Sequence, residues 1–240
     1  MVHPSETASK GPIWAALLEP GVKHALFVGI GIQILQQFSG INGVLYYTPQ
    51  ILEEAGVSVL LESFGLSTTS ASFLISAFTT LLMLPCIGLA MKLMDITGRR
   101  ILLLTTLPVL IVSLILLVIA NLVTLSSVIE AAISTTCLVT AYGPIPNILC
   151  SEIFPTRVRG LCIAICALAY WISDIIVTYT LPVLLDSIGL AGIFGIYAVV
   201  CVISLVFIYL KVPETKGMPL EVITEFFSVG ARQIAAAKNE

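Results

Sequence analysis

The chain has 240 residues, of which 58% are hydrophobic and 10% are charged. Its mean hydropathy is +1.07, which excludes an ordinary soluble domain, because about a quarter of the residues in such a domain are charged. Eleven Lys and Arg against fourteen Asp and Glu give a net charge of −3. There is no basic excess to attract nucleic acid, so nucleic acid is not an expected partner. The composition predicts an integral membrane protein.

Long uncharged runs predict six membrane-spanning helices. A helix needs about 20 apolar residues to cross a hydrocarbon layer of about 30 Å, and open strand edges would leave backbone groups unpaired in lipid. The first twenty residues lack the features of a signal peptide and have the Pro, Ser and Thr content of a linker. We therefore expect an all-α membrane protein. The predicted spans are residues 25–52, 63–91, 101–129, 131–151, 160–185 and 187–210.

The basic residues predict how these helices are oriented. All eleven fall in segments that an even number of crossings places on one side, whereas the opposite loops contain acidic residues and no Lys or Arg. Because cytoplasmic loops carry the excess of Lys and Arg, we expect both termini in the cytosol. The eleven residues are Lys10, Lys23, Lys92, Arg99, Arg100, Arg157, Arg159, Lys211, Lys216, Arg232 and Lys238.

The six cysteines all fall inside apolar stretches, with no CxxC pair and no neighbouring His. We interpret them as small buried side chains and expect no metal site.

The first predicted span is too polar for a helix that only anchors the chain. At about 100° per residue, Gln36, Gln37 and Asn42 fall on one wide arc with Gln33 and several Tyr and Gly residues, whereas the opposite strip, including Ile41, is expected to face lipid. Unpaired amides cost several kcal/mol in lipid, so the arc must face other helices or a wet cavity. Carboxamides match the paired hydroxyls of a sugar. The alternative is that they only hold helices together.

The fourth predicted span ends in TAYGPIPNILCSEIFP. Pro144 and Pro146 lack a backbone donor and Gly143 adds freedom, so we expect the helix to be broken or bent there. Transporters use broken helices to build sites near the midplane. A kink that serves packing alone is the alternative.

The fifth predicted span contains Tyr170, Trp171 and Asp174. An indole can stack on the apolar face of a sugar ring and donate to a hydroxyl. A charge at this depth costs roughly 2.5–3.5 kcal/mol on insertion scales and is usually retained for a purpose. Two interpretations of Asp174 remain open, namely proton coupling and a hydrogen-bonded contact between helices.

Four motifs occur in order along the chain: QILQQFSGINGVLYY, MDITGRR, GPIPNILCSEIFPTRVRG and VPETKG. Together, over residues 21–217, they resemble the sugar porter family of the major facilitator superfamily. Three further segments are similar to the plant tonoplast monosaccharide transporters of the monosaccharide-sensing type, which are proton-coupled hexose carriers of the vacuolar membrane. These segments are the first twenty residues, GINGVLYYTPQILEEAG and KGMPLEVITEFFSVGA.

That family has twelve helices in two halves, and the chain resembles the second half. The resemblance implies a cytosolic linker over residues 1–20, a six-helix bundle over 21–211 and a cytosolic tail over 212–240. The partners implied are a monosaccharide, membrane lipid and an N-terminal six-helix half that supplies the main proton-binding acid. It implies no enzyme activity and no cofactor beyond protons as a possible coupling ion. The expected location is the vacuolar membrane.

The resemblance also implies roles for individual residues. By position, Gln36, Gln37 and Asn42 match amides that contact hexose hydroxyls, Tyr46 matches an aromatic beside the outward gate, and Trp171 matches the site tryptophan.

Four positions depart from the family pattern. Met83 and Asp174 stand where Asn is common, Asn147 replaces Trp, and Tyr170 replaces Asn or Gln. We include Asn147 in the predicted site because it can replace a lost polar contact. The interval 100–143 is also several residues shorter than usual in the family.

Charged residues in the cytosolic loops between spans two and three and between spans four and five predict a gate. We expect them to pair when the cytosolic side is closed, since exposed pairs contribute only about 0–1 kcal/mol and can therefore open. The alternative is that they only set the topology. The predicted gate residues are Asp95, Arg99, Arg100, Glu152 and Arg159.

These features predict the second half of a proton-coupled hexose transporter that works by alternating access. The alternatives are a carrier of another polar solute on the same fold, and a non-transporting sensor or regulatory half-protein.

Overall fold

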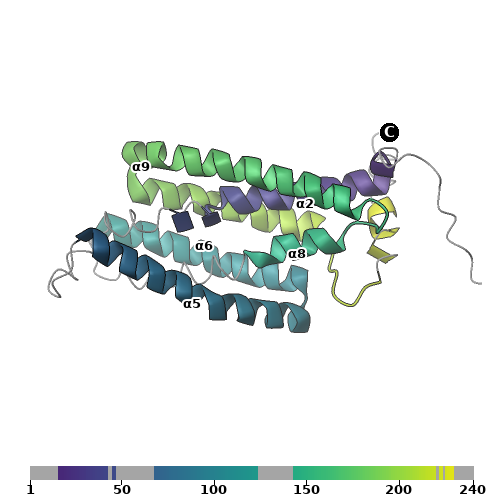
Figure 1. The fold of residues 1–240 in the computed structure, drawn as a ribbon, viewed down its shortest axis with the longest axis horizontal. Coiled ribbons are helices and arrows are strands. Elements are labelled where there is room, and N and C mark those ends of the chain that lie inside the picture. The colour runs from purple at the N-terminus through teal and green to yellow at the C-terminus, as the bar shows by residue number, and fades with distance from the viewer. Residues whose placement is uncertain are drawn as a thin grey trace, which may run out of the picture.

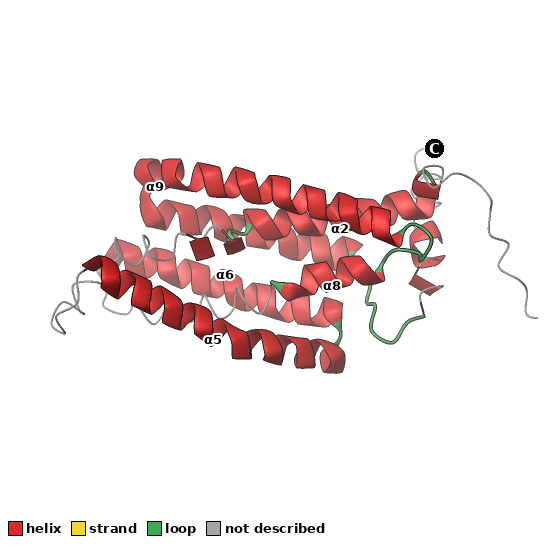
Figure 2. Cartoon of the chain, viewed as in Figure 1, coloured by secondary structure: helices red, strands yellow, loops and turns green. Residues whose placement is uncertain are grey.

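The structure is a computed structural model that describes residues 16–42, 45–46, 68–123, 143–219, 222–223 and 225–229. These residues form a bundle of long helices with their axes roughly aligned (Figure 1). Figure 2 shows helices and connecting loops, with no strand in the described ranges. The helices are α2 (Pro20–Phe38), α5 (Thr68–Thr97), α6 (Arg99–Val123), α8 (Pro144–Glu152) and α9 (Arg159–Lys211).

Helix α9 contains two antiparallel arms. A straight helix of its 53 residues would measure about 80 Å, more than twice the hydrocarbon thickness of a bilayer. Gly189 interrupts it with φ 66° and ψ 179°, a conformation that glycine adopts without a steric penalty. The chain reverses there, and the arms 159–188 and 190–211 run in opposite directions (Figure 1). The boundary between the predicted spans 160–185 and 187–210 thus lies three residues before this reversal.

Two segments of the described chain are long and apolar enough to cross a membrane. They are Arg99–Ile119, with a mean hydropathy of 2.9, and Arg159–Lys211, with a mean hydropathy of 2.7. The count of six crossings stays a prediction. The parts of the predicted spans that lie outside the described residues are 43–44, 47–52, 63–67, 124–129 and 131–142.

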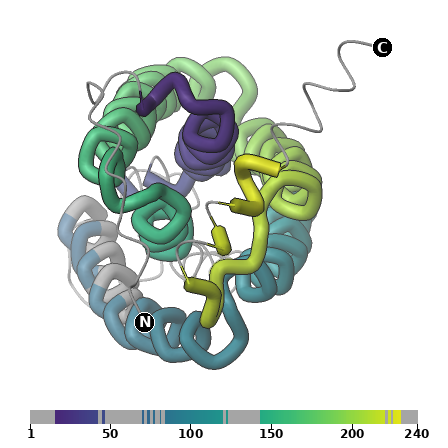
Figure 3. Tube along the Cα trace, turned by 90° about the vertical axis from the view of Figure 1, so that its right-hand side faces the viewer, coloured from purple at the N-terminus to yellow at the C-terminus, as the bar shows by residue number. Residues whose placement is uncertain are grey.

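Helix α2 lies between the two arms of α9 (Figure 3). Glycines permit this close approach: a Cβ on Gly29 would lie 2.9 Å from Cys166 Sγ in the first arm. A Cβ on Gly31 would lie 2.6 Å from the Phe207 ring in the second arm. Helix α6 also packs on α9 and buries one face completely. Outward-facing aliphatic side chains of α5, α6 and α9 remain exposed, as expected for surfaces that contact lipid.

Helix α2 ends just before its polar arc is complete. It stops at Phe38, and Gly40 has a φ of 82° and donates its N–H to the Gln37 carbonyl over 2.9 Å. Such left-handed glycines commonly terminate helices. Residues beyond Gly40 therefore no longer follow the 100° arc, and Ile41, predicted to face lipid, is instead buried at 5% exposure.

We predict that Gly40→Ala destabilises the protein more than Gly189→Ala. A Cβ at Gly40 would lie 2.2 Å from the Tyr197 ring in addition to the positive φ, whereas the Cβ at Gly189 has no neighbour within 4 Å. Backbone strain alone costs about 1–3 kcal/mol. Thermal unfolding in detergent measures the difference. The control is Gly88→Ala in α5, which also has no neighbour within 4 Å, and which should be neutral or stabilising. Equal decreases of the unfolding temperature in the Gly40 and Gly189 variants would contradict the predicted clash with Tyr197.

Candidate functional site

Three glutamines of α2 form the first candidate cluster. Gln33, Gln36 and Gln37 are 2%, 2% and 0% exposed. Their spacing of three and four residues places them on one face of the helix. The sequence predicted this arc, and the structure turns it toward the other helices of the bundle.

Two of these glutamines bind the start of α8. Gln33 Nε2 donates to Asn147 Oδ1 over 2.8 Å and to Cys150 Sγ over 3.5 Å. Gln36 Nε2 donates to the Gly143 carbonyl over 2.7 Å. Helix α8 begins at Pro144, directly after that carbonyl. The Gly-Pro sequence, predicted to break or bend a helix, thus stands where a helix begins and faces the amides of α2.

Several buried polar atoms of the site have no hydrogen-bond partner in the described part of the chain. They are both amide atoms of Gln37, the Oε1 atoms of Gln33 and Gln36, and Oδ1 of Asp174. Asp174 is 6% exposed. Leaving such groups unpaired costs about 1–3 kcal/mol each, so these atoms are candidates for contact with a polar solute.

The aromatic residues lie beyond the end of α2. Asn42 Nδ2 donates to Tyr170 Oη over 2.8 Å, and the Tyr170 ring stands edge-on to Trp171 at 5.4 Å. The Tyr46 hydroxyl lies within electrostatic range of Asp174 and Tyr170. Trp171 and Tyr46 are both more than half exposed. The structure thus joins Asn42 to Tyr170.

The departures from the family pattern have different surroundings. Asn147 is exposed yet accepts the hydrogen bond from Gln33. Tyr170, which the sequence did not single out as a site residue, is the partner of Asn42. Met83 lies in α5, and its side chain is outside the described set.

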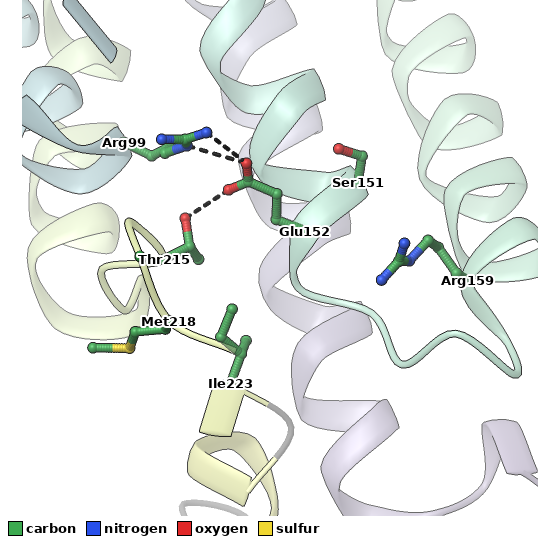
Figure 4. A pocket seen from close by; sticks show the side chains of 8 residues that line it. Arg99, Ser151, Glu152, Arg159, Thr215, Met218 and Ile223 are labelled. Carbon is green, nitrogen blue, oxygen red and sulfur yellow. Dashed lines mark hydrogen bonds and ion pairs between the residues drawn. The ribbon is translucent and has the colours of Figure 1, made fainter. Parts of the chain in front are cut away.

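A second cluster surrounds Glu152 at the end of α8 (Figure 4). Glu152 Oε1 accepts hydrogen bonds from Arg99 Nε at 3.1 Å and pairs with Arg99 Nη2 at 2.9 Å. Thr215 Oγ1 donates to Glu152 Oε2 over 2.7 Å. Arg99 also pairs with Asp95 at 3.5 Å. One carboxylate thus joins α6, α8 and the segment after α9.

Arg100 and Arg159, also predicted for the gate, bind backbone oxygens. Arg100 Nη2 donates to the Tyr209 carbonyl over 2.8 Å. The Cζ atom of Arg100 lies 5.9 Å from the centroid of the Tyr209 ring. Arg159 Nε donates to the Phe154 carbonyl over 3.2 Å.

Glu214 and Thr215 were missed as functional residues. Glu214 accepts backbone hydrogen bonds from Arg99 at 2.9 Å and Ile101 at 3.2 Å, so it caps the first turn of α6. Gly98, with φ 99°, leaves room for that carboxylate, which would lie 2.8 Å from an added Cβ. The available signal was the VPETKG motif, which places an acidic and a hydroxyl side chain just after the last predicted span.

An open hollow of ≈ 380 Å³ adjoins Glu152 (Figure 4). Its lining residues are Arg99, Ser151, Glu152, Arg159, Thr215, Gly217, Met218 and Ile223.

Five of the six cysteines lie in the described part of the chain. Cys150, Cys162, Cys166 and Cys201 are buried and unbridged, as predicted, and Cys86 is half-buried. Cys137 lies outside the described residues. Within the described ranges, no group of three or more His, Cys, Asp or Glu is placed to hold a metal ion.

Comparison with known families identifies the type of protein. Residues 2–227 match the family model described as "Sugar (and other) transporter". The chain belongs to this family. The sugar porter resemblance of the four motifs is thereby confirmed, and the family consists of multi-pass membrane transporters, not enzymes.

The similarity to one type of sugar transporter is high. The chain is 70% identical to Monosaccharide-sensing protein 2 of Arabidopsis thaliana over 247 aligned residues. The alignment covers 100% of this chain and 34% of that protein. The chain therefore spans about a third of the length of this relative.

Solved sugar transporters share the fold. A crystal structure of a double-Trp mutant of XylE matches with a TM-score of 0.72 and 26% identity, covering 85% of this chain and 43% of that one. A D-xylose-proton symporter matches with a TM-score of 0.67 and 31% identity, covering 84% and 46%. The chain therefore has the major facilitator fold over the part that aligns, which is less than half of each neighbour.

Proposed function

We propose that this chain is the second, six-helix half of a proton-coupled hexose transporter of the vacuolar membrane that works by alternating access. The observation that carries the proposal is the cluster of buried glutamine amides on α2 whose remaining atoms have no partner in the described chain. Each such atom matches a sugar hydroxyl. The printed names of the similar proteins, a monosaccharide-sensing protein and a D-xylose-proton symporter, support a sugar as solute and a proton as coupling ion.

The proposed organisation follows the family fold. Residues 1–20 are the end of a cytosolic loop, 21–211 form the bundle, and 212–240 are a cytosolic tail. Another half of the transporter completes the solute passage. The partial coverage of the structural neighbours, 43% and 46% of their lengths, supports this arrangement. Both termini are proposed to be cytosolic because the loops predicted for that side carry all eleven Lys and Arg residues.

The proposed solute site extends from the glutamines to the aromatic residues. Buried amides on α2 hold the ring hydroxyls, the α8 start closes one side, and the exposed aromatic faces cover the apolar face of the sugar. The same amides suit another polyhydroxyl solute, which is the remaining alternative. Membership of a transporter family favours transport over a non-transporting sensor. The proposed contacts are Gln36, Gln37, Asn42, Tyr46, Asn147 and Trp171.

Asp174 is the proposed coupling residue of this half. It is buried at 6% exposure with one carboxylate oxygen unpartnered in the described chain. Tyr46 and Tyr170 lie within electrostatic range of one another on the aromatic side of the site.

The proposed cytosolic latch consists of Asp95, Arg99, Arg100, Glu152 and Arg159, and the Arg99–Glu152 ion pair is its central contact. The Arg99–Glu152 pair is partly exposed, with side chains at 16% and 27%, so water weakens the pair and it can open. Alternating access requires two arrangements separated by only a few kcal/mol. An ion pair of this strength shifts the equilibrium between the two arrangements and still allows both to be populated.

Gln37→Ala in the complete transporter should weaken D-glucose binding about tenfold. The amide is fully buried and its hydrogen bonds to the solute are worth about 1–3 kcal/mol. Equilibrium binding of labelled D-glucose measures the effect. Thr106→Val is the control, because the hydrogen bonds of this α6 hydroxyl within the described residues go to carbonyls of its own helix. Unchanged affinity would remove Gln37 from the site.

Glu152→Arg should slow uptake several-fold by placing two cations together at the latch and shifting the population toward the open cytosolic side. Combining it with Arg99→Glu should restore part of the rate because the pair is rebuilt with reversed charges. Initial uptake rates in vesicles provide the readout. Glu225→Arg, an exposed reversal in the tail, is the control. Normal uptake by the single Glu152 variant would contradict the latch and would leave Arg99 and Glu152 with a role in membrane topology only.

Asp174→Asn should abolish accumulation driven by a pH gradient while preserving exchange of labelled for unlabelled sugar. The amide keeps the size of the side chain and can still form hydrogen bonds, but it has no titratable group. Vesicle uptake with and without an imposed gradient separates the two activities. Asp186→Asn, an exposed acid of the same helix, is the control. Full gradient-driven accumulation by the Asp174 variant would assign this carboxyl to helix packing.

A further inference from the structure

Three buried cysteines of the described chain gather where α8, α2 and the first arm of α9 meet. Cys150 lies in α8, and Cys162 and Cys166 lie about one turn apart in α9. Their exposed fractions are 2%, 0% and 1%, and all three are unbridged. A buried thiol is inert unless a neighbouring group activates it, so the surroundings of each sulfur decide what it can do.

Two of the sulfurs flank Gly29 of α2. Cys150 Sγ lies 3.7 Å from the Gly29 carbonyl oxygen. A Cβ on Gly29 would lie 2.9 Å from Cys166 Sγ, so the missing side chain leaves the space beside this sulfur. The side chains of Cys150 and Cys166 also interact with each other. The two thiols are therefore neighbours across the boundary between α8 and α9.

The hydrogen bonds distinguish Cys150 from Cys166. Gln33 Nε2 donates to Cys150 Sγ over 3.5 Å, and such a donor stabilises negative charge on the sulfur. The groups that act on Cys166 within the described residues are the other thiols, Cys150 and Cys162. Because the thiolate is the nucleophile, Cys150 is assigned as the sulfur that reacts first and Cys166 as the sulfur that then reacts with it.

We propose that Cys150 and Cys166 form a disulfide when hydrogen peroxide reaches them, and that this bond slows transport. The Cys150 sulfur attacks one peroxide oxygen, the O–O bond breaks, water leaves, and Cys150 becomes a sulfenic acid. The Cys166 sulfur then attacks the Cys150 sulfur, the S–O bond breaks, and a second water leaves. Two thiols and one peroxide thus give one disulfide and two waters, and the two electrons lost by the sulfurs reduce the peroxide.

The disulfide restricts the segment that carries part of the proposed latch. The loop closed between Cys150 and Cys166 contains Glu152 and Arg159. Bond formation brings the two sulfurs to about 2.0 Å and therefore fixes α8 against the first arm of α9. Alternating access needs the helices to change their arrangement, so a covalent tether between these two lowers the rate. The effect on transport rests on the proposed function, whereas the formation of the disulfide does not.

The first test maps the bond and does not depend on transport. The complete transporter in detergent is treated with hydrogen peroxide, and the remaining free thiols are alkylated before digestion with trypsin. Cleavage after Arg157 and Arg159 places the two cysteines on separate peptides. Tandem mass spectrometry should find these peptides joined through Cys150 and Cys166, and dithiothreitol should separate them. Absence of this link, or links between other cysteines in its place, would overturn the inference.

The second test asks whether the bond controls transport. Initial uptake of D-glucose into vesicles is measured before peroxide, after peroxide and after dithiothreitol. Peroxide should lower the rate several-fold, and dithiothreitol should restore it. Cys166→Ala and Cys150→Ser should each remove the peroxide effect, because either change leaves one thiol of the pair. Cys201→Ala, which removes a buried cysteine of the second arm, is the control and should respond as the unaltered protein does.

The compared quantity is the ratio of the two rates within each variant, so a change in the basal rate does not affect the result. If uptake is absent before oxidation, the proposed function fails and the effect on transport falls with it, while peptide mapping still decides whether the disulfide forms. If the disulfide forms and uptake is unchanged, the regulatory role is wrong. A Cys166→Ala variant that responds to peroxide as the unaltered protein does would also contradict that role.

Discussion

Polar groups enclosed in a lipid-surrounded bundle must find hydrogen-bond partners, and this requirement organises the structure around α2. Its glutamines are satisfied in part by the start of α8, where the Gly143 carbonyl and the Asn147 side chain each hold one amide nitrogen. The remaining amide atoms stay buried without partners in the described chain. The same contacts thus position a short helix and leave buried amide atoms, which the proposed function assigns to a solute.

The approach of the helices depends on residues without side chains. Gly29 and Gly31 allow α2 to contact both arms of α9, and Gly40 packs directly against the ring of Tyr197. Small residues have this role in membrane bundles because the attraction between helices there comes from close packing and hydrogen bonds. At the opposite end of the bundle, charged side chains replace this close packing. The Glu152 carboxylate gathers Arg99 and Thr215 from segments far apart in the sequence, in an exposed setting that permits separation.

The membrane class, the family and the polar face of α2 could be predicted from the sequence, because hydropathy, motif order and amide spacing are local properties. The polar arc containing Gln36 and the boundary at Gly143 were located in this way. The position of Ile41 was wrong because a uniform helical arc ignores the positive φ of Gly40. The partners of Gln33 and Asn42 could not be predicted, since they lie 114 to 128 residues away in sequence. The charged gate residues were expected to pair with one another, and two of them, Arg99 and Glu152, do so. Glu214 carried a motif signal, but its role as a cap for α6 depends on tertiary contacts.

The cap on α6 has a consequence for the order in which the molecule is completed. The N–H groups of Arg99 and Ile101 donate to the carboxylate of Glu214, which lies 115 and 113 positions later in the chain. Synthesis proceeds from the N-terminus, so α6 is made and inserted well before Glu214 leaves the ribosome. Until then its leading amides bind water. The N-terminal end of α6 therefore reaches its mature state only after translation of the segment that follows α9, which makes the formation of this junction one of the final steps of assembly.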